Sequence, residues 1–199
     1  GALYALERAS SFVEDIILSN IPVFDVDWIF VWGPLIFWII IAIILILNPR
    51  KIPFTLKSIA FFILIRSLFV SLTHIGPFPD HLTLNSYSVQ WMNDYFGIPP
   101  FFSFVFSSGS DLFFSAHTGL PFLMALVFWE NRLTRIYCIT SSIFFAAIVL
   151  MGHLHYSIDV ASAFFITYTI YKLATHTFKG EYERFYTGYT HTTKLSDPT

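Results

Sequence analysis

Apolar residues occur in five runs along the chain, separated by shorter polar segments. The clearest run extends from Trp28 to Leu47 and contains twenty residues without a charge. As a helix that rises about 1.5 Å per residue, this run would cross about 30 Å of hydrocarbon, the thickness of a bilayer core. The other four runs are shorter or interrupted, and they cover 58–73, 117–129, 136–151 and 156–174. The pattern predicts an all-α, polytopic membrane helix bundle with five transmembrane helices.

The residues before the first run show an amphipathic pattern. Between Leu3 and Asn20, large aliphatic side chains recur among Glu7, Arg8, Glu14 and Asp15. Such a segment is too polar to cross a bilayer and is typical of a helix that lies in the membrane interface. We therefore expect an N-terminal amphipathic interfacial helix. The whole chain, 1–199, would form a single membrane-embedded domain, with 1–27 as its interfacial segment and 176–199 as a cytoplasmic tail.

Composition narrows the class of protein further. The chain is 55% hydrophobic, 20% aromatic and only 12% charged, with a mean hydropathy of +0.65. Soluble domains contain about 25% charged residues, so these values exclude a soluble, disordered or coiled-coil protein. The net charge of -2 supplies no basic field, and we expect no nucleic-acid partner. The one cysteine, Cys138, excludes an intrachain disulfide.

The distribution of Lys and Arg predicts the orientation in the membrane. Cytoplasmic loops accumulate these residues, whereas translocated loops do not. Nine of the eleven would lie on one side: Arg50, Lys51, Lys57, Arg132, Arg135, Lys172, Lys179, Arg184 and Lys194. The long connection 74–116 has none, so we place it on the non-cytoplasmic face. The alternative is that Arg66 prevents the run 58–73 from crossing the membrane, but Lys and Arg would then no longer be concentrated on one side.

Ionisable residues cluster at two places that open on this same face. The first cluster is Asp111-Leu-Phe-Phe-Ser115-Ala-His117-Thr118, at the start of the third span, and the second is His153-Leu-His155-Tyr-Ser-Ile-Asp159, at the start of the fifth. One span down and one span back separate the clusters, so the fold could bring them together. Ionisable groups are costly near a bilayer, and such a concentration indicates a functional site.

The spacing within the second cluster suggests chemistry. His155 and Asp159 are four residues apart, so on a helix the carboxylate could accept the imidazole N–H, orient the ring and leave the other nitrogen as nucleophile or base. His117 could act as a general acid. The helix start after Ser115 also suits a phosphate, because its backbone N–H groups are unpaired. A single histidine would more often anchor an interface, but three histidines and two aspartates on one face favour function.

The two clusters resemble the motifs of a known family. Gly109-Ser-Asp111-Leu-Phe-Phe-Ser115-Ala-His117-Thr118 is similar to the G-D-x-x-F-S-G-H-T motif of the sphingomyelin synthase family, a branch of the type 2 phosphatidic acid phosphatase superfamily. The stretch from His155 to Tyr168 resembles the H-Y-T-x-D-V motif and its helix. Arg66 and the residues after it resemble the family's Arg-containing helix more weakly. Together the likeness extends from about Arg66 to His176.

This resemblance implies metal-independent phosphoester exchange through a phosphohistidine-type intermediate. By motif, His155 is the nucleophile, Asp159 orients it, and His117 protonates the leaving hydroxyl and later deprotonates the acceptor. Arg66 would neutralise phosphate oxygens, or alternatively snorkel or pair with a carboxylate. The remaining candidates for substrate binding are Asp111, Ser115 and Thr118. For Ser115 helix capping is an equal explanation, and Asp111 could act indirectly.

The chain also departs from the family pattern. Ala116 replaces the Gly of S-G-H-T, the superfamily's K-x-x-x-x-x-x-R-P motif has no counterpart, and no Ser-Arg pair precedes His155. A soluble-type acid phosphatase is therefore disfavoured. Compared with the larger synthases, the chain would also lack the extended N-terminal region and one span, so the resemblance does not by itself predict their head-group preference.

These observations rank three functions. The first is an enzyme that transfers a phosphate or phospho-head group from a phospholipid to a lipid hydroxyl, such as that of ceramide or diacylglycerol, or to water, with no cofactor or metal. The second is a zinc-dependent, ceramidase-like lipid hydrolase that uses His117, His153, His155 and Asp159. Against it, His153 and His155 would diverge on a regular helix. The third is a non-enzymatic lipid carrier or channel. No oligomeric state follows from the sequence.

Overall fold

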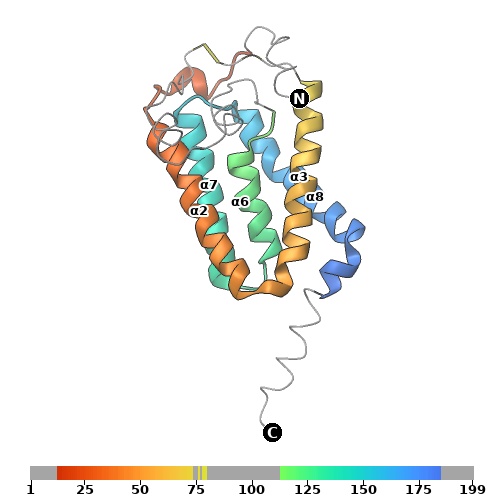
Figure 1. Cartoon of the computed structure of the whole chain (residues 1–199). Helices are drawn as coiled ribbons and strands as arrows, with labels where there is room; N and C mark the ends of the chain where they lie inside the picture. Colours follow the sequence, from red (N-terminus) through yellow and green to blue (C-terminus); the bar gives the residue numbers. More distant parts are fainter. Residues whose placement is uncertain (1–12, 74–75, 77, 80–112, 185–199) are drawn as a thin grey trace, which may run out of the picture.

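The structure is a computed structural model that describes residues 13–73, 76, 78–79 and 113–184 (Figure 1). Within these ranges all regular structure is helical and no strand occurs, which confirms the all-α prediction. In chain order the elements are η1 (Leu18–Asn20), α2 (Asp27–Leu47), η2 (Pro49–Lys51), α3 (Ile52–Leu72), α6 (Ala116–Val127), α7 (Arg132–Met151) and α8 (Ser157–Thr177).

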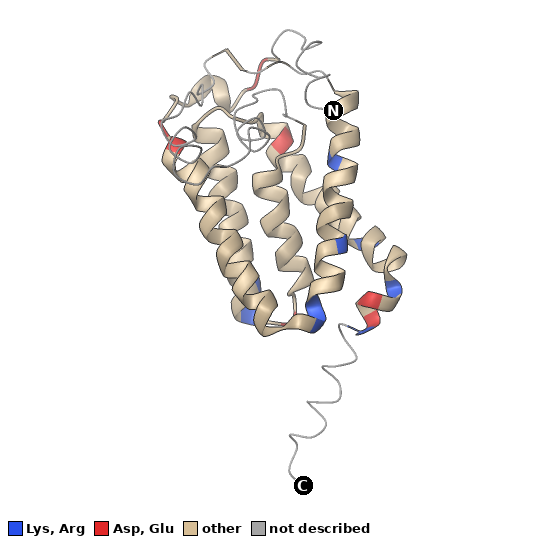
Figure 2. Cartoon of the chain, in the orientation of Figure 1, with Lys and Arg blue, Asp and Glu red and all other residues tan. Residues whose placement is uncertain are grey.

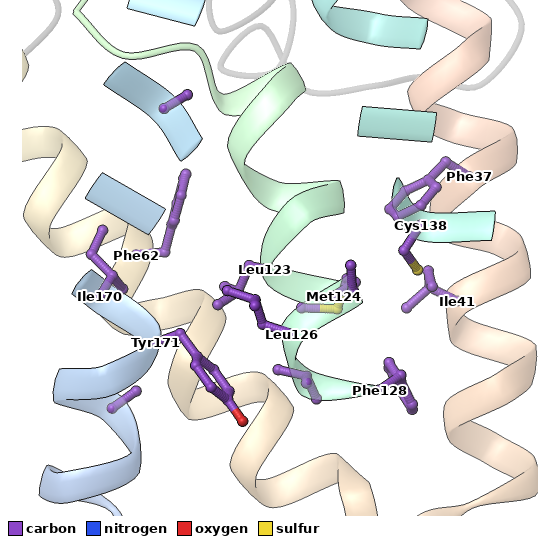
Figure 3. Close-up of a cluster of buried hydrophobic side chains, with 14 of the residues drawn as sticks. Phe37, Ile41, Phe62, Leu123, Met124, Leu126, Phe128, Cys138, Ile170 and Tyr171 are labelled. Carbon is purple, nitrogen blue, oxygen red and sulfur yellow. The ribbon is translucent and has the colours of Figure 1, made fainter. Parts of the chain in front are cut away.

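Helix α6 lies at the centre of the bundle. It packs against α7, α8 and α3, while α2 packs on α7 (Figure 1). Most of its side chains are buried, and Leu123 and Met124 are fully enclosed. Figure 3 shows these two residues between Ile41 of α2 on one side and Phe62 of α3 on the other. The shortest of the long helices therefore forms the core around which the others assemble.

The outer helices present apolar side chains to their surroundings. Ile46 and Leu47 of α2, Leu133 of α7 and Phe165 of α8 are each more than 70% exposed. A soluble protein does not expose apolar surface on this scale, because the hydrophobic effect would bury it. By length and composition, three helical stretches in the described part of the chain can cross a membrane: Asp27–Leu47, Pro49–Leu72 and Arg132–Met151. The apolar helices thus indicate an integral membrane protein.

Helices are present at all five predicted spans. Two of them, α6 and α8, do not have both the length and the hydropathy that a membrane span requires. The twelve residues of α6 would reach about 18 Å, less than the hydrocarbon thickness. Helix α8 has 21 residues, but it also carries Asp159, Lys172 and His176. Helices α3 and α7 begin several residues before their apolar runs, because Lys and Arg are compatible with helical structure and can extend from it into the interface.

The N-terminal segment differs from the predicted interfacial helix. Residues 13–15 have no regular secondary structure, 16–17 form a turn, and only the short η1 follows. The cause is the Asp15 side chain, whose Oδ1 accepts the backbone N–H groups of Ile17 and Leu18 at 2.9 and 3.2 Å. A short carboxylate that bonds to its own neighbouring N–H groups competes with helix formation. The earlier part of the predicted helix, 1–12, lies outside the described residues.

The first part of the predicted tail packs against the bundle. Residues 179–184 are helical. Phe178 contacts Phe61 of α3 edge to face, with ring centroids 6.0 Å apart, and Lys57 of α3 forms an ion pair with Glu181. That pair lowers the pKa of the Glu181 carboxyl, because the ammonium group donates a hydrogen bond to it. The cytoplasmic location of 176–199 stays a prediction, and 185–199 lie outside the described residues.

Basic residues gather at one end of the bundle (Figure 2). Arg50 and Lys51 lie in η2, between α2 and α3, and Arg132 and Arg135 lie in the first turn of α7. The first turns of α6 and α8 lie at the opposite end (Figure 1). The two histidine clusters and the basic residues between spans are thus separated by the length of the helices.

Candidate active site

The two predicted clusters meet at the first turns of α6 and α8. The backbone N–H of Ser115, just before α6, donates a hydrogen bond of 3.2 Å to the carbonyl oxygen of Asp159 in α8. This bond joins positions 44 residues apart in the chain. Helices α6 and α8 also pack along their length, so the contact is part of the bundle and fixes the two motifs relative to each other.

Ser115 is the N-cap of α6. It has the extended backbone typical of that position, and its Oγ accepts the N–H of Thr118 at 3.4 Å. Thr118 is fully buried, and its carbonyl oxygen accepts the hydroxyl of Ser142 in α7 at 2.7 Å. The Oγ1 atom of Thr118 has no hydrogen-bond partner in the described structure. Two predicted substrate-binding residues therefore lie at the start of α6, Ser115 as its N-cap and Thr118 in its first turn.

His155 and Asp159 approach each other in a different way from the predicted helical pairing. Helix α8 begins at Ser157, so His155 precedes the helix and does not share a helical face with Asp159. Asp159, the third helical residue, reaches back so that its Oδ2 accepts the N–H of Tyr156 at 3.1 Å, as the acidic residue of a capping box does. The same oxygen lies 3.8 Å from Nδ1 of His155, within ion-pair range but beyond a hydrogen bond.

Both partners of this pair are buried. The side chain of His155 is 7% exposed and that of Asp159 is not exposed at all. The second carboxylate oxygen of Asp159, Oδ1, has no hydrogen-bond partner among the described residues. Nδ1 is therefore the ring nitrogen of His155 that pairs with the carboxylate.

His117 interacts electrostatically with both His155 and Arg66. The three side chains come from α6, from the segment just before α8 and from α3. On another side the ring packs against Phe30 of α2, with the two ring centroids 4.2 Å apart. His117 therefore stands between an apolar wall and two groups that can carry positive charge.

Arg66 is tied to the segment that precedes α6. Its Nε–H donates a hydrogen bond of 3.1 Å to the carbonyl oxygen of Phe114. Phe114 has a positive φ of 31° and is completely buried against Phe62 and Phe69 of α3. A non-glycine residue in this conformation is uncommon, and the packing holds it there. The turn that directs the chain into α6 is thus fixed by α3 through both aromatic contacts and Arg66.

His153 does not join these residues through a hydrogen bond. It has a positive φ of 52°, is 4% exposed, and packs edge to face on Phe78. Neither ring nitrogen has a hydrogen-bond partner in the described part of the chain. Among those residues no group of three or more His, Cys, Asp or Glu is placed to hold a metal ion, so the zinc ligand set considered above is not assembled there. Asp111 lies outside the described residues.

Sequence reasoning did not identify two residues that hold this region together. Tyr156 donates its hydroxyl to the carbonyl oxygen of Gly76 at 2.8 Å, and Asp15 accepts the N–H of Ser157 at 2.7 Å. Tyr156 was visible only as part of a motif. Asp15 was visible only as a charge in an amphipathic segment, and no spacing rule connects it to a helix that begins 142 residues later.

Comparison with known families gives one match. Residues 109–177 match the family described as PAP2 superfamily C-terminal. The match supports a relationship of this chain to the PAP2 superfamily. It contains both histidine clusters and the helices α6, α7 and α8 between and after them. Comparison with curated proteins and with solved structures gave no match. PAP2 superfamily proteins are phosphatases and phosphotransferases. The match therefore supports an enzymatic function of the lipid phosphatase or phosphotransferase type.

Proposed function

We propose that this protein is a membrane-embedded, metal-independent enzyme that transfers a phosphate or phospho-head group from a phospholipid, with His155 as the nucleophile. The observation that carries the proposal is the junction of the two motifs, where the hydrogen bond from Ser115 to Asp159 holds His117 and His155 at one site. The PAP2 superfamily match over the same residues supports a phosphoester reaction.

In the first step Nε2 of His155 attacks the phosphorus atom of the donor lipid. An N–P bond forms, and the P–O bond to the leaving group breaks with its electron pair on oxygen. His117, protonated, gives its proton to that oxygen, so the leaving lipid departs as an alcohol. The Asp159 carboxylate, beside Nδ1, stabilises the positive charge that develops on the His155 ring.

In the second step the acceptor replaces the leaving lipid. His117, now neutral, takes the proton of the acceptor hydroxyl as its oxygen attacks phosphorus. The new O–P bond forms, the N–P bond breaks, and the electron pair returns to Nε2 of His155. The cycle neither consumes nor releases a net proton, because His117 gives one and recovers one.

The phosphoryl oxygens need positive charge and hydrogen-bond donors nearby. Arg66 is a cation that interacts electrostatically with His117, and the hydroxyl of Thr118, in the first turn of α6, has no hydrogen-bond partner among the described residues. The start of that helix adds the positive end of its dipole. We assign Arg66, Ser115 and Thr118 to phosphate binding, with Ser115 acting through the helix cap, and Asp111 to the same site by its motif.

The acceptor defines the reaction. Transfer to ceramide or diacylglycerol would make the enzyme sphingomyelin synthase-like, whereas transfer to water would make it a lipid phosphatase or phospholipase C-like hydrolase. Both reactions use the same two steps, and a lipid donor accounts for a site at the end of membrane helices. The same exchange chemistry is proposed for either acceptor, and the products of the assay below identify which one is used.

The test is an assay of purified protein in mixed lipid with chelator present. Phosphatidic acid, phosphatidylcholine and phosphatidylethanolamine are supplied with ceramide and diacylglycerol, and products are measured by mass spectrometry. We expect a new phospholipid, or free phosphate or phospho-base, with wild-type protein and none with His155→Ala. The proposed nucleophile would be wrong if a folded His155→Ala protein kept wild-type turnover.

A further inference from the structure

Asp15 is a buried carboxylate that the proposed mechanism does not use. Asp15 is only 6% exposed, and it lies outside the region that matches the PAP2 superfamily. Oδ1 accepts the N–H groups of Ile17 and Leu18, and Oδ2 accepts the N–H of Ser157 at 2.7 Å. One oxygen therefore shapes the local turn, while the other reaches the first residue of α8.

The carboxylate is charged in this position at neutral pH. Burial alone would raise the pKa of Asp15, but hydrogen bonds from Ser157, Leu18 and Ile17 outweigh it, and the pKa lies below its ordinary value of 3.8. An anion at the N-terminus of a helix interacts favourably with the helix dipole, and its hydrogen bond to the backbone is charge-assisted. The contact with α8 is thus a strong one.

Two other hydrogen bonds attach the same segment near the start of α8. The N–H of Val13 donates to the hydroxyl of Tyr156 at 3.3 Å, and the N–H of Phe24 donates to the carbonyl oxygen of Met151 at 2.9 Å. We call residues 13–26 the N-terminal strap. The strap is fastened on both sides of Asp15 to the chain that leads from α7 into α8.

The N–H groups that follow His155 are each held by a different carboxylate. Asp159 accepts the N–H of Tyr156, and Asp15 accepts the N–H of Ser157. Without Asp15 the Ser157 N–H would lose its partner in the first turn of the helix. Asp159 has an oxygen without a partner in the described structure, so we expect it to turn toward that N–H and away from His155.

We propose that Asp15 is a positioning residue, and that the N-terminal strap is part of the active site because it holds the backbone that carries His155 and Asp159. The inference rests on the proposed function for its catalytic consequence. Its structural part, that Asp15 holds the first turn of α8, stands independently and has its own measurement.

Four variants separate this role from a general effect on stability. Asp15→Ala removes the acceptor, and Asp15→Asn keeps an oxygen that can accept the Ser157 N–H. Ser157→Pro removes the donor from the other side of the bond. Proline is well accepted at the first position of a helix, and the preceding residue, Tyr156, already has the extended backbone that proline requires (φ −68°, ψ 155°). Glu14→Gln, at an exposed neighbouring carboxylate, is the matched control.

Two readouts are measured on the full-length protein. Hydrogen exchange followed by mass spectrometry reports the first turn of α8, and the mixed-lipid assay reports kcat and KM for the product that wild type forms. We expect faster exchange in that turn for Asp15→Ala and Ser157→Pro, and a kcat lower by about 10²-fold with KM nearly unchanged. Asp15→Asn should recover part of kcat. A protein that carries both Asp15→Ala and Ser157→Pro should have a kcat no lower than either single variant, because the two substitutions remove the same hydrogen bond.

The outcomes distinguish the two proposals. If exchange rises in both variants but wild type has no phosphoester activity, the proposed function fails while the role of Asp15 in holding α8 stands. If exchange and kcat in Asp15→Ala and Ser157→Pro equal those of Glu14→Gln, the positioning role is overturned. A uniform rise of exchange across all helices, with kcat falling only as folded protein is lost, would also overturn it. If Asp15→Ala does not fold, Ser157→Pro alone decides between these outcomes.

Discussion

Asp159 has a structural role in the helix cap and a proposed role beside His155, and a single substitution can separate the two. Its Oδ2 caps α8 by accepting the Tyr156 N–H and also lies 3.8 Å from Nδ1 of His155. Asparagine at this position keeps an oxygen for the N–H but loses the negative charge that would stabilise an imidazolium. We expect Asp159→Asn to fold with an unfolding temperature near wild type, and to lose about 10⁴-fold in turnover, as an equivalent change does in a serine protease triad.

Asp159→Ala is the companion variant in this test. It loses the cap as well as the charge, so it should lose turnover and also about 1 kcal/mol of stability. Thermal unfolding in detergent and the mixed-lipid assay measure the two effects. Wild-type turnover by folded Asp159→Asn would show that the charge beside His155 is not needed.

Individual residues also show where sequence reasoning ended. The pattern at Ser115 predicted a helix start, because a side chain that can cap precedes an apolar run. The i to i+4 spacing of His155 and Asp159 predicted a helical pair, but the helix begins after His155, and the two meet through the cap instead. The partners of Asp15 could not be predicted, because they are backbone N–H groups, which every residue except proline has.

At the scale of helices, α6 packs closely against both α8 and α3 at Gly119. A Cβ atom at Gly119 would lie 2.8 Å from Oγ1 of Thr167 and 2.9 Å from Cζ of Phe62, and both of those side chains are fully buried. Alanine usually stabilises a helix relative to glycine. Here it would force buried atoms apart, so we expect Gly119→Ala to lower the free energy of unfolding by about 1–3 kcal/mol.

The chain offers a matched control for this substitution. Gly180 lies in the helical residues after α8, and a Cβ there would meet nothing within 4 Å. Gly180→Ala should therefore be neutral or stabilise by up to about 1 kcal/mol. Thermal unfolding in detergent compares the two variants. Because Gly119 is two residues after His117, we also expect turnover to fall in Gly119→Ala alone, and equal stability of both variants would contradict the close packing.

Helix existence was predictable from the apolar runs, whereas helix lengths were not. A run of apolar residues reports where a helix meets lipid or core, but the backbone can continue into polar sequence, as α3 and α7 do at their N-termini. The central position of α6 also had no signature in the sequence. Its residues are apolar in the same way as those of α2, although one helix is enclosed by protein and the other exposes large aliphatic side chains.

At the scale of the whole molecule, the charge distribution predicts which way the site faces. Arg50, Lys51, Arg132 and Arg135 lie at the end opposite the first turns of α6 and α8. Cytoplasmic loops accumulate such residues, so the end with His155 should face the other side of the membrane. The sequence predicted that the two clusters would meet at this end, because a span down and a span back return the chain to the same side.

Single-cysteine labelling tests this orientation. Ser19 is exposed in η1, at the end that carries the first turn of α8, and Glu130 is exposed between α6 and α7 at the basic end. The native Cys138 is fully buried and should give little background. In intact cells, a membrane-impermeant maleimide should react with Ser19→Cys, whereas Glu130→Cys should react only after permeabilisation. The reverse pattern would place the site in the cytoplasm, and its lipid acceptor would then have to come from the cytoplasmic leaflet.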